Sequence, residues 1–488
     1  MRTLIYTIAL FCLLSGLCSF GASYYVDKNA SGSNDGTSWT NAWRSFGDID
    51  WSDLDPGDTI FISGGATSKV YAETLTVGKE GSAGQNIVIR TGQDEGHRGV
   101  VIIDGQDSLE HCILLENHVT IDGEVTGEIR MLCRGSRWAG IKATGAEGNV
   151  VRYVEITECG DGTAPGGFDH GIHFQGADGC EVAYCEIHHV YQDGYNAGGS
   201  VGTSFGNNKV HHNWIYHISD DAIGCRSGHD IYDNVIGEVY QHPNCGTGHP
   251  DGIQAQGNYT RVWGNEIYNC STHGIFADPL NCGTAEHIRI WNNLVYRTDS
   301  DIHMQGIKVK QERGTNSVNH ILVANNTVVD IGYLAIEIKC DVTSDVIVEN
   351  NLVFNCRLSG QYGYVIGTLD NVGTIDYNCV SKGPSGGDKM MWNAVSMEYI
   401  DFVSNGHGQL NGQTGTPLFV SWDEMDRDQD GQNFRLSEDD TACVGNGVDL
   451  SQFFTTDKDG KTRTTWDIGC FALSGGNVDP PGNIHLDY

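Results

Sequence analysis

The chain has 488 residues, with 63 acidic against 29 basic side chains and a formal net charge of −34. A surface this acidic repels nucleic acids and anionic membranes, which argues against both as partners. Glycine is frequent, at 65 residues, and proline is scarce, at 9. This balance suits many short strands joined by turns, and the length allows one large domain with an appendage.

The first residues have the pattern of a secretion signal. Arg2 supplies a positive charge, an apolar run extends from Leu4 to Phe20, and small residues follow as far as Ser23. We therefore expect residues 1–22 to be removed and the mature protein to be secreted, either extracellular or periplasmic. No later stretch of the sequence is apolar enough to predict a membrane span.

The chain has 16 cysteines, of which Cys12 and Cys18 lie within the expected signal. An even number therefore stays in an exported protein, which favours several disulfides. No Cys-x-x-Cys pair occurs, so the spacing argues against a zinc ribbon.

A repeated motif, Val/Ile-x-x-Asn-x-Val/Ile, runs through the middle of the chain at spacings of about 21 to 33 residues. No amphipathic helix lies between the copies, so a single unit cannot close a core, whereas stacked coils of parallel strands can. We interpret the recurring Asn as an internal ladder in which each side-chain amide bonds the coils above and below. The copies are centred on Cys185, Asn213, Asn234, Asn265, Asn293, Asn326 and Asn351.

Both ends of the mature chain carry further signals. Residues 24–36 (YYVDKNASGSNDG) and the ending Asp467–Phe471, after Asp457–Gly460, resemble the terminal segments of secreted right-handed parallel β-helix proteins of the pectate lyase and polygalacturonase-like superfamily. The repeats strengthen this resemblance, which implies an all-β solenoid with an N-terminal cap. We expect the β-helix over 23–380, the last coils and a C-terminal cap over 381–478, a tail over 479–488, and a monomer.

A second motif, a small residue followed by Ile, precedes each Asn motif. If each Ile faces the core, and a turn or bulge occurs at the small residue, the residues two before, one after and three after the Ile face outward and form three columns along the stack. A plain solvent-facing sheet carries no special order, so His, Asp, Arg and Lys on successive coils favour a polysaccharide-binding groove. The columns are Ala139, His170, Asp221, Asp251, His273, Gln305 and Leu334; Lys142, His173, Gly224, Gln254, Phe276, Lys308 and Glu337; and Thr144, Gln175, Arg226, Gln256, Asp278, Lys310 and Lys339.

Two carboxylates in this arrangement predict either a metal ion or an unusual protonation state. Asp221 and Asp251 fall in one column on neighbouring coils, about 4.8 Å apart, and Asp220 adjoins them. Ionised carboxylates this close repel each other, so we expect Asp220, Asp221 and Asp251 to bind Ca²⁺ beside Arg226. In the alternative, one carboxyl stays protonated and acts as a general acid.

The side chains needed for β-elimination on a uronate polymer are present. That reaction requires a base and a cation that neutralises the substrate carboxylate. We expect Lys308 and Arg226 to supply them, with Asp221 and Asp251 completing the catalytic set. The side chains expected to bind substrate are His170, His173, His249, Gln254, His273, Asp278 and Lys310.

The segment Ser219–Ile223, with Gly306-Ile307-Lys308 further on, resembles the Asp-Asp-Gly and Gly-x-Lys elements of the calcium-dependent pectate lyases of polysaccharide lyase family nine. The resemblance implies that Asp220 and Asp221 bind Ca²⁺ and that Lys308 is the base. The chain departs from that family at Gly224, where the family has a further Asp, and in the separation of 87 residues between Asp221 and Lys308.

Three other functions fit the same residues. The pair Asp220-Asp221, with Gly248-His249-Pro250 and Gly306-Ile307-Lys308, also resembles polygalacturonases, which implies a glycoside hydrolase with Asp220, Asp221 and Asp251 as acid and base. An epimerase would use similar groups without cleavage. A non-catalytic carbohydrate-binding or surface protein is the alternative from another class, since β-helix repeats also serve as plain scaffolds.

Overall fold

The computed structural model describes residues 21–473 except for the segments 165–166, 199–205, 243–247, 279–283, 300–301, 311–316, 340–341, 357–363, 367–373, 385–388, 393–394 and 423–431. The expected signal peptide, apart from its last two residues, and the expected tail at 479–488 lie outside the described residues. None of the helices described is long and apolar enough to cross a membrane.

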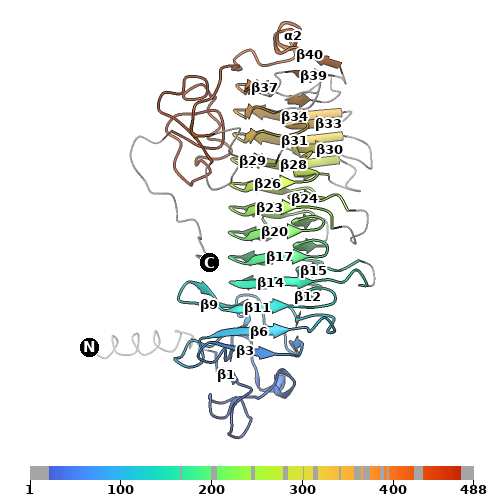
Figure 1. Ribbon diagram of the computed structural model, residues 1–488, viewed down its shortest axis with the longest axis vertical. Coiled ribbons are helices and arrows are strands. Elements are labelled where there is room, and N and C mark those ends of the chain that lie inside the picture. Colours follow the sequence, from blue (N-terminus) through green and yellow to red (C-terminus); the bar gives the residue numbers. More distant parts are fainter. Residues whose placement is uncertain are drawn as a thin grey trace, which may run out of the picture.

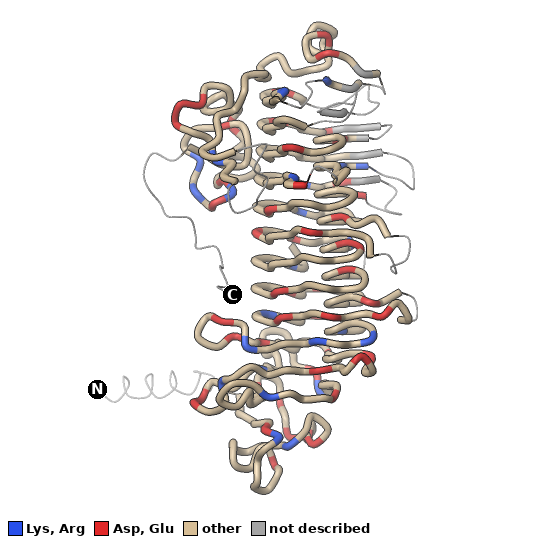
Figure 2. Tube along the Cα trace, viewed as in Figure 1, with Lys and Arg blue, Asp and Glu red and all other residues tan. Residues whose placement is uncertain are grey.

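The chain winds into stacked coils, and each complete coil adds one strand to each of three parallel sheets (Figure 1). We call the three sheets A, B and C, and within a coil the chain passes through sheet A, then sheet B, then sheet C. Neighbouring strands of a sheet come from successive coils, which confirms the predicted parallel β-helix. Acidic side chains occur on coils along the whole length of the stack (Figure 2).

Over the described residues the sheets hold 13, 12 and 13 strands respectively. Sheet A consists of β1 (Ser23–Val26), β2 (Thr59–Ile62), β5 (Ile87–Thr91), β8 (Val119–Asp122), β13 (Val150–Arg152), β16 (Glu181–Ala183), β19 (Asn208–His211), β22 (His229–Tyr232), β25 (Thr260–Trp263), β28 (Thr284–Trp291), β31 (Ser317–Ala324), β34 (Val342–Glu349) and β37 (Thr374–Asp376). Sheet B consists of β3 (Ser68–Tyr71), β6 (Val100–Asp104), β11 (Met131–Arg134), β14 (Val154–Cys159), β17 (Glu186–Val190), β20 (Trp214–Ile218), β23 (Val235–Val239), β26 (Glu266–Cys270), β29 (Leu294–Tyr296), β32 (Thr327–Val329), β35 (Leu352–Phe354) and β38 (Cys379–Ser381). Sheet C consists of β4 (Leu75–Thr76), β7 (Ile113–Leu115), β12 (Ile141–Thr144), β15 (Ile172–Gln175), β18 (Tyr195–Ala197), β21 (Ile223–Cys225), β24 (Ile253–Ala255), β27 (His273–Ala277), β30 (Gln305–Lys310), β33 (Ile336–Lys339), β36 (Tyr364–Ile366), β39 (Met390–Trp392) and the antiparallel β40 (Val395–Met397).

The asparagine ladder is confirmed at the turn between sheets A and B. In each step the Nδ2 of one Asn donates to the Oδ1 of the Asn on the next coil, over 2.9–3.0 Å. The side chains are buried, so each satisfied amide avoids the cost of an unpaired polar group inside the stack. The ladder comprises Asn213, Asn234, Asn265, Asn293, Asn326, Asn351 and Asn378.

The Ile of each small-Ile motif faces the interior, as predicted, and each of these side chains is at most 1% exposed. They stack on the Ile and Val side chains of sheets A and B in one continuous apolar core. Because strand residues alternate between the two faces of a sheet, this orientation directs the neighbouring polar residues of sheet C outward. The motif residues are Ile141, Ile172, Ile223, Ile253, Ile275, Ile307 and Ile336.

Both ends of the stack are covered. At the N-terminal end the segment with the 3₁₀ turns η1 (Phe46–Asp48) and η2 (Trp51–Asp53) buries Trp43, Phe46 and Leu54. At the other end the short helix α2 (Tyr399–Ser404) buries Phe402. Two small antiparallel pairs complete the described elements: β9 (Glu124–Val125) with β10 (Glu128–Ile129), and β41 (Phe419–Ser421) with β42 (Asn433–Leu436).

The segment after α2 runs back along the side of the stack (Figure 1). It contacts the corner between sheets A and B, where Asn325 donates to the carbonyls of Asp467 and Gly469 and Asn350 donates to that of Val448. Its Phe454 stacks on Trp291. These contacts leave the outer face of sheet C, where the sequence predicts the groove, on another side of the molecule.

Eleven cysteines lie in the described part of the chain, and all eleven are buried free thiols. The predicted disulfides therefore have no support among these residues. Burial raises the pKa of such thiols, for example that of Cys180 to about 11 and that of Cys185 to about 12. The eleven cysteines act as small apolar core residues.

Candidate functional site

The predicted columns exist on the outer face of sheet C, and the strand register aligns them. Ile172 pairs with Tyr195, Tyr195 with Ile223, and Ile223 with Ile253. The coil of Tyr195 was not predicted from the sequence, because Gly194-Tyr195 has an aromatic residue where the motif requires Ile. This coil contributes Asp193. The middle part of the first column, which we call the acid column, is therefore His170, Asp193, Asp221, Asp251 and His273.

Backbone amides support the carboxylates of the acid column. The N–H of Asp221 donates to Asp193 Oδ1 at 3.2 Å, the N–H of Asp251 to Asp221 Oδ1 at 3.3 Å, and the N–H of His273 to Asp251 Oδ1 at 3.0 Å. Each carboxylate thus receives a hydrogen bond from the next coil. All three aspartates are buried, and Asp251 is completely inaccessible. This ladder stabilises negative charge that would otherwise be costly to bury.

Burial nevertheless changes the protonation of the column. Burial raises the pKa of Asp193 to about 6. The pKa of Asp220 also rises to about 6, first through burial and then through the charge of Asp193. The pKa of Asp221 is raised well above its usual value by burial, and the neighbouring carboxylates Asp193, Asp251 and Asp220 raise it further. The site therefore attracts either protons or a cation.

His249 lies beside three of these carboxylates. Its ring Nδ1 is 3.5 Å from Asp251 Oδ2 and 3.8 Å from Asp221 Oδ1. Its backbone N–H donates to Asp220 Oδ1 at 3.0 Å. The interactions with Asp221 and Asp251 raise the pKa of His249 to about 11. Its side chain is 55% exposed, so this imidazolium faces the surface of the groove while it offsets buried negative charge.

One group in the described chain has the spacing of metal ligands. Asp220, Asp221 and His249 each offer one ligand atom, and these atoms lie within 4.8 Å of one another. Asp251, predicted as the third ligand, is instead engaged through Oδ1 with His273. Its Oδ2 is buried and has no hydrogen-bond partner among the described residues. Calcium takes oxygen ligands, so Asp220 and Asp221 fit it and His249 does not.

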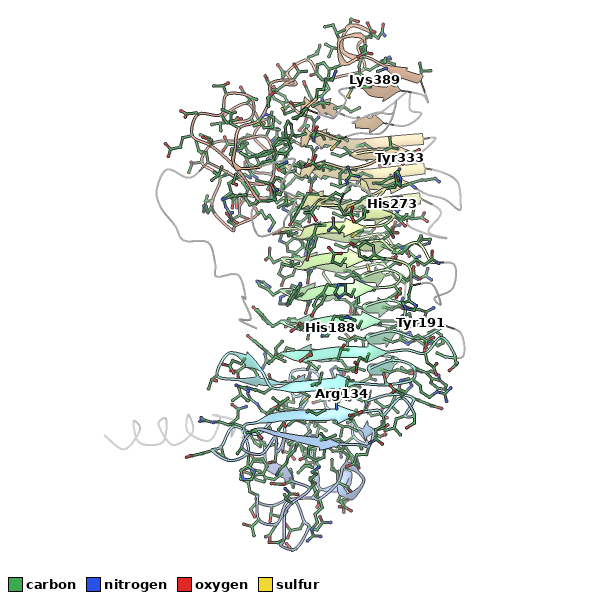
Figure 3. All side chains as sticks on the ribbon, in the orientation of Figure 1. Arg134, His188, Tyr191, His273, Tyr333 and Lys389 are labelled. Carbon is green, nitrogen blue, oxygen red and sulfur yellow. The ribbon has the colours of Figure 1, made fainter. Side chains whose placement is uncertain are left out.

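Asp251, His273 and Lys308 form a chain of contacts across three successive coils. His273 Nδ1 lies 2.7 Å from Asp251 Oδ1, and its Nε2 lies 3.2 Å from Lys308 Nζ. The carboxylate therefore fixes the tautomer with hydrogen on Nδ1, and the lone pair of Nε2 faces the ammonium. Lys308 also lies over the ring of Phe276, at 4.6 Å from its centroid. Figure 3 shows His273 on the side of the stack away from the C-terminal segment.

Neutral imidazoles occupy the N-terminal part of the groove. Burial lowers the pKa of both His170 and His173 to about 3. His173 stacks on Phe168 with 4.7 Å between the ring centroids, and its buried Nδ1 has no hydrogen-bond partner within the described segments. Each neutral ring can donate one hydrogen bond and accept one.

The remaining predicted residues lie around this centre. Gln254 Nε2 lies 3.2 Å from the Nδ1 of His249. Arg226, Asp278 and Lys310 occupy the predicted third column, five residues along the strand from the acid column. In the described structure no ion pair joins Arg226 to Asp220, Asp221 or Asp251. The cation beside these carboxylates is therefore His249 and not Arg226, which was expected there.

Gly224 leaves a gap in the second column, between Asn196 and Gln254. A Cβ added to Gly224 would lie 3.1 Å from Asp193 Oδ2 and 3.3 Å from Asn196 Nδ2. Any side chain here would crowd the acid column. The glycine thus leaves room beside Asp193 and Asn196 that a larger residue would fill.

No protein-family model matches the chain, and no curated protein matches it. Solved structures do match. Pectate lyase Pel9A is 16% identical over 93% of this chain and 96% of its own, with a TM-score of 0.50. XylC, solved in complex with xylose, is 13% identical over 93% of this chain and 98% of its own, with a TM-score of 0.52. At these identities the likeness shows a shared fold alone: the chain has the parallel β-helix fold of these two proteins.

Proposed function

We propose that this protein is a secreted enzyme that cleaves a uronate-containing extracellular polysaccharide by β-elimination. The observation that carries the proposal is the chain of contacts from Asp251 through His273 to Lys308 on sheet C, which runs from a buried carboxylate to the partly exposed Lys308. In this chain of contacts His273 Nε2 is a proton acceptor, because its tautomer is fixed by Asp251, and the cation Lys308 lies 3.2 Å from it. These are the two groups that abstraction of a proton next to a carboxylate requires.

In this proposal Lys308 Nζ turns from His273 Nε2 to the carboxylate of the uronate, and the freed lone pair of Nε2 accepts the C5 proton. The electron pair of the C5–H bond forms the C4–C5 double bond, and the C4–O bond breaks. The leaving oxygen takes a proton from the imidazolium of His249. Lys308 was expected from the sequence to be the base; its contact with His273 Nε2 favours the role of the cation, because an ammonium donating to an imidazole keeps its own proton.

The proposal also includes a calcium ion, with Asp220 and Asp221 as its ligands. Bound there, the ion would supply positive charge toward a substrate carboxylate. The raised pKa values of the two carboxyl groups favour such a cation, because it would offset their repulsion in place of protons. Chelation followed by calcium addition, measured on both activity and melting temperature, tests this element separately from the proton transfer.

The first experiment is incubation with pectate, alginate and glycosaminoglycans, with ultraviolet absorbance reporting the unsaturated product. On the substrate that responds, His273→Gln should lower kcat by about 10²- to 10⁴-fold. Lys308→Arg should retain at least about a tenth of the rate, because arginine keeps the charge but cannot act as a base. His320→Gln is the matched control, since His320 is an exposed histidine of sheet A paired with Asp345.

The kinetics of these variants distinguish His273 from Lys308 as the base, and the product assay distinguishes an enzyme from a binding protein. If Lys308→Arg loses as much activity as His273→Gln, Lys308 is the base, as the sequence suggested. If His273→Gln keeps full activity, the proposed proton acceptor is wrong. If no polymer yields an unsaturated product while a glycan array shows binding, the protein is a carbohydrate-binding protein and the enzyme proposal fails.

A glycoside hydrolase is the second candidate, and the raised pKa of Asp221 favours it. A carboxyl group that stays protonated near neutral pH is a suitable general acid for glycosidic oxygen. Cleavage that produces new reducing ends without ultraviolet absorbance, and that Asp221→Asn abolishes, would support the hydrolase over the lyase.

A further inference from the structure

A hollow lies at the corner where sheet B turns into sheet C, and we call it the corner groove. It has a volume of about 780 Å³ and is lined by residues of successive coils, among them Glu158, Tyr191, His217, Glu238 and Tyr240. This volume lies within the range of about 300–1,000 Å³ typical of ligand sites. Apart from Asp107, its lining comes from four successive coils, from Glu158 to His242, which corresponds to about 14 Å along the stack.

The corner groove adjoins the acid column directly. Tyr191 precedes Asp193 by two residues, and Ser219, which also lines the groove, precedes Asp221 by two residues. Tyr191 and His273 lie toward the same side of the stack (Figure 3). A polysaccharide bound over the acid column can therefore continue around the corner without a break.

The chemistry of the corner groove differs from that of the acid column. Its described lining contains the carboxylates Asp107, Glu158 and Glu238 but neither lysine nor arginine. A uronate would be repelled here. The exposed imidazole of His217 lies 4.7 Å, centroid to centroid, from that of His189. Tyr191 and Tyr240 add aromatic surface with polar tips, which suits the mixed apolar and hydroxyl faces of an uncharged sugar.

We propose that the corner groove is a subsite for neutral sugar residues of the same polysaccharide. The inference rests on the proposed function and narrows its substrate to heteropolymers in which uncharged sugars neighbour the uronate. Carboxylates and imidazoles accept and donate hydrogen bonds to sugar hydroxyls, while the tyrosine rings cover the C–H faces. A pure polyuronate would place a carboxylate against Glu158 and Glu238 and bind there poorly.

Calorimetric binding to glucuronoxylan, rhamnogalacturonan and polygalacturonate tests the inference, with His273→Gln as the background that prevents cleavage. Tyr191→Ala should weaken binding of at least one of the two mixed polymers by about tenfold and leave polygalacturonate binding unchanged. Glu158→Lys should strengthen polygalacturonate binding by a similar factor, because it places a cation in the groove. Glu95→Lys, an exposed site elsewhere, is the matched control for charge, and circular dichroism checks that each variant folds.

The inference is overturned if Tyr191→Ala binds both mixed polymers as the parent does, or if Glu158→Lys behaves like Glu95→Lys. Its failure is distinct from failure of the proposed function. A protein that releases unsaturated products with unaffected Tyr191→Ala kinetics keeps the lyase and loses the subsite. A protein that cleaves nothing but loses mixed-polymer binding in Tyr191→Ala keeps the subsite and loses the lyase.

Discussion

Replacing Asp220 by Asn should make the protein more stable at neutral pH and leave it unchanged in acid. The folded state holds the pKa of Asp220 at about 6, against 3.8 for the free group, so folded protein binds this proton more tightly than unfolded protein. The free energy of unfolding that the proton contributes is therefore present below pH 4 and is lost as the pH rises to about 6. Asn cannot ionise, and its Oδ1 can still accept from the N–H of His249, at 3.0 Å in the parent.

The raised pKa of Asp220 corresponds to a gain in the free energy of unfolding of at most about 3 kcal/mol for Asp220→Asn. Because Asp220 is partly exposed, solvent screening lowers the expected gain to about 1–2 kcal/mol at pH 7. Chemical denaturation between pH 4 and pH 8, with chelator present, measures the difference between Asp220→Asn and the parent. Asp439→Asn, at an exposed position of the C-terminal segment, provides the control. A difference that is constant across this range, or a variant less stable than the parent at pH 7, would refute the reasoning.

Three further predictions follow from the fold and the groove. Asn293→Ala should lower the free energy of unfolding by about 3 kcal/mol, because it removes the acceptor of the buried N–H and Nδ2 of Asn265; a loss below 1 kcal/mol by denaturation would contradict a structural ladder. Gly224→Val should raise KM by about tenfold with little change in kcat, since its Cβ would crowd Asp193; unchanged kinetics would show that the gap is not used. Ellman's reagent should leave the eleven buried thiols unreacted in native protein and label them after denaturation without reductant; unlabelled thiols would instead reveal disulfides.

The repetitive part of the fold could be predicted from the sequence because its information is local. Period-2 alternation directs Ile223 and Ile253 inward and the residues that follow them, Gly224 and Gln254, to the opposite face of the strand. A buried amide such as Asn265 needs hydrogen-bond partners, and stacking identical coils provides them. Coil, ladder and columns therefore follow from short segments read one at a time.

The composition of the site depended on contacts between coils, which short segments do not encode. Asp193 was missed because Tyr195 fills the same core position as Ile, and only the strand register shows that equivalence. His249, not Arg226, lies beside the carboxylates, because the path of the chain before β24 brings its ring within 3.5 Å of Asp251. Local patterns in the sequence predict the coils and the residues that flank each core Ile. Which of those residues meet follows from the tertiary structure, because distances between coils depend on how each corner turns.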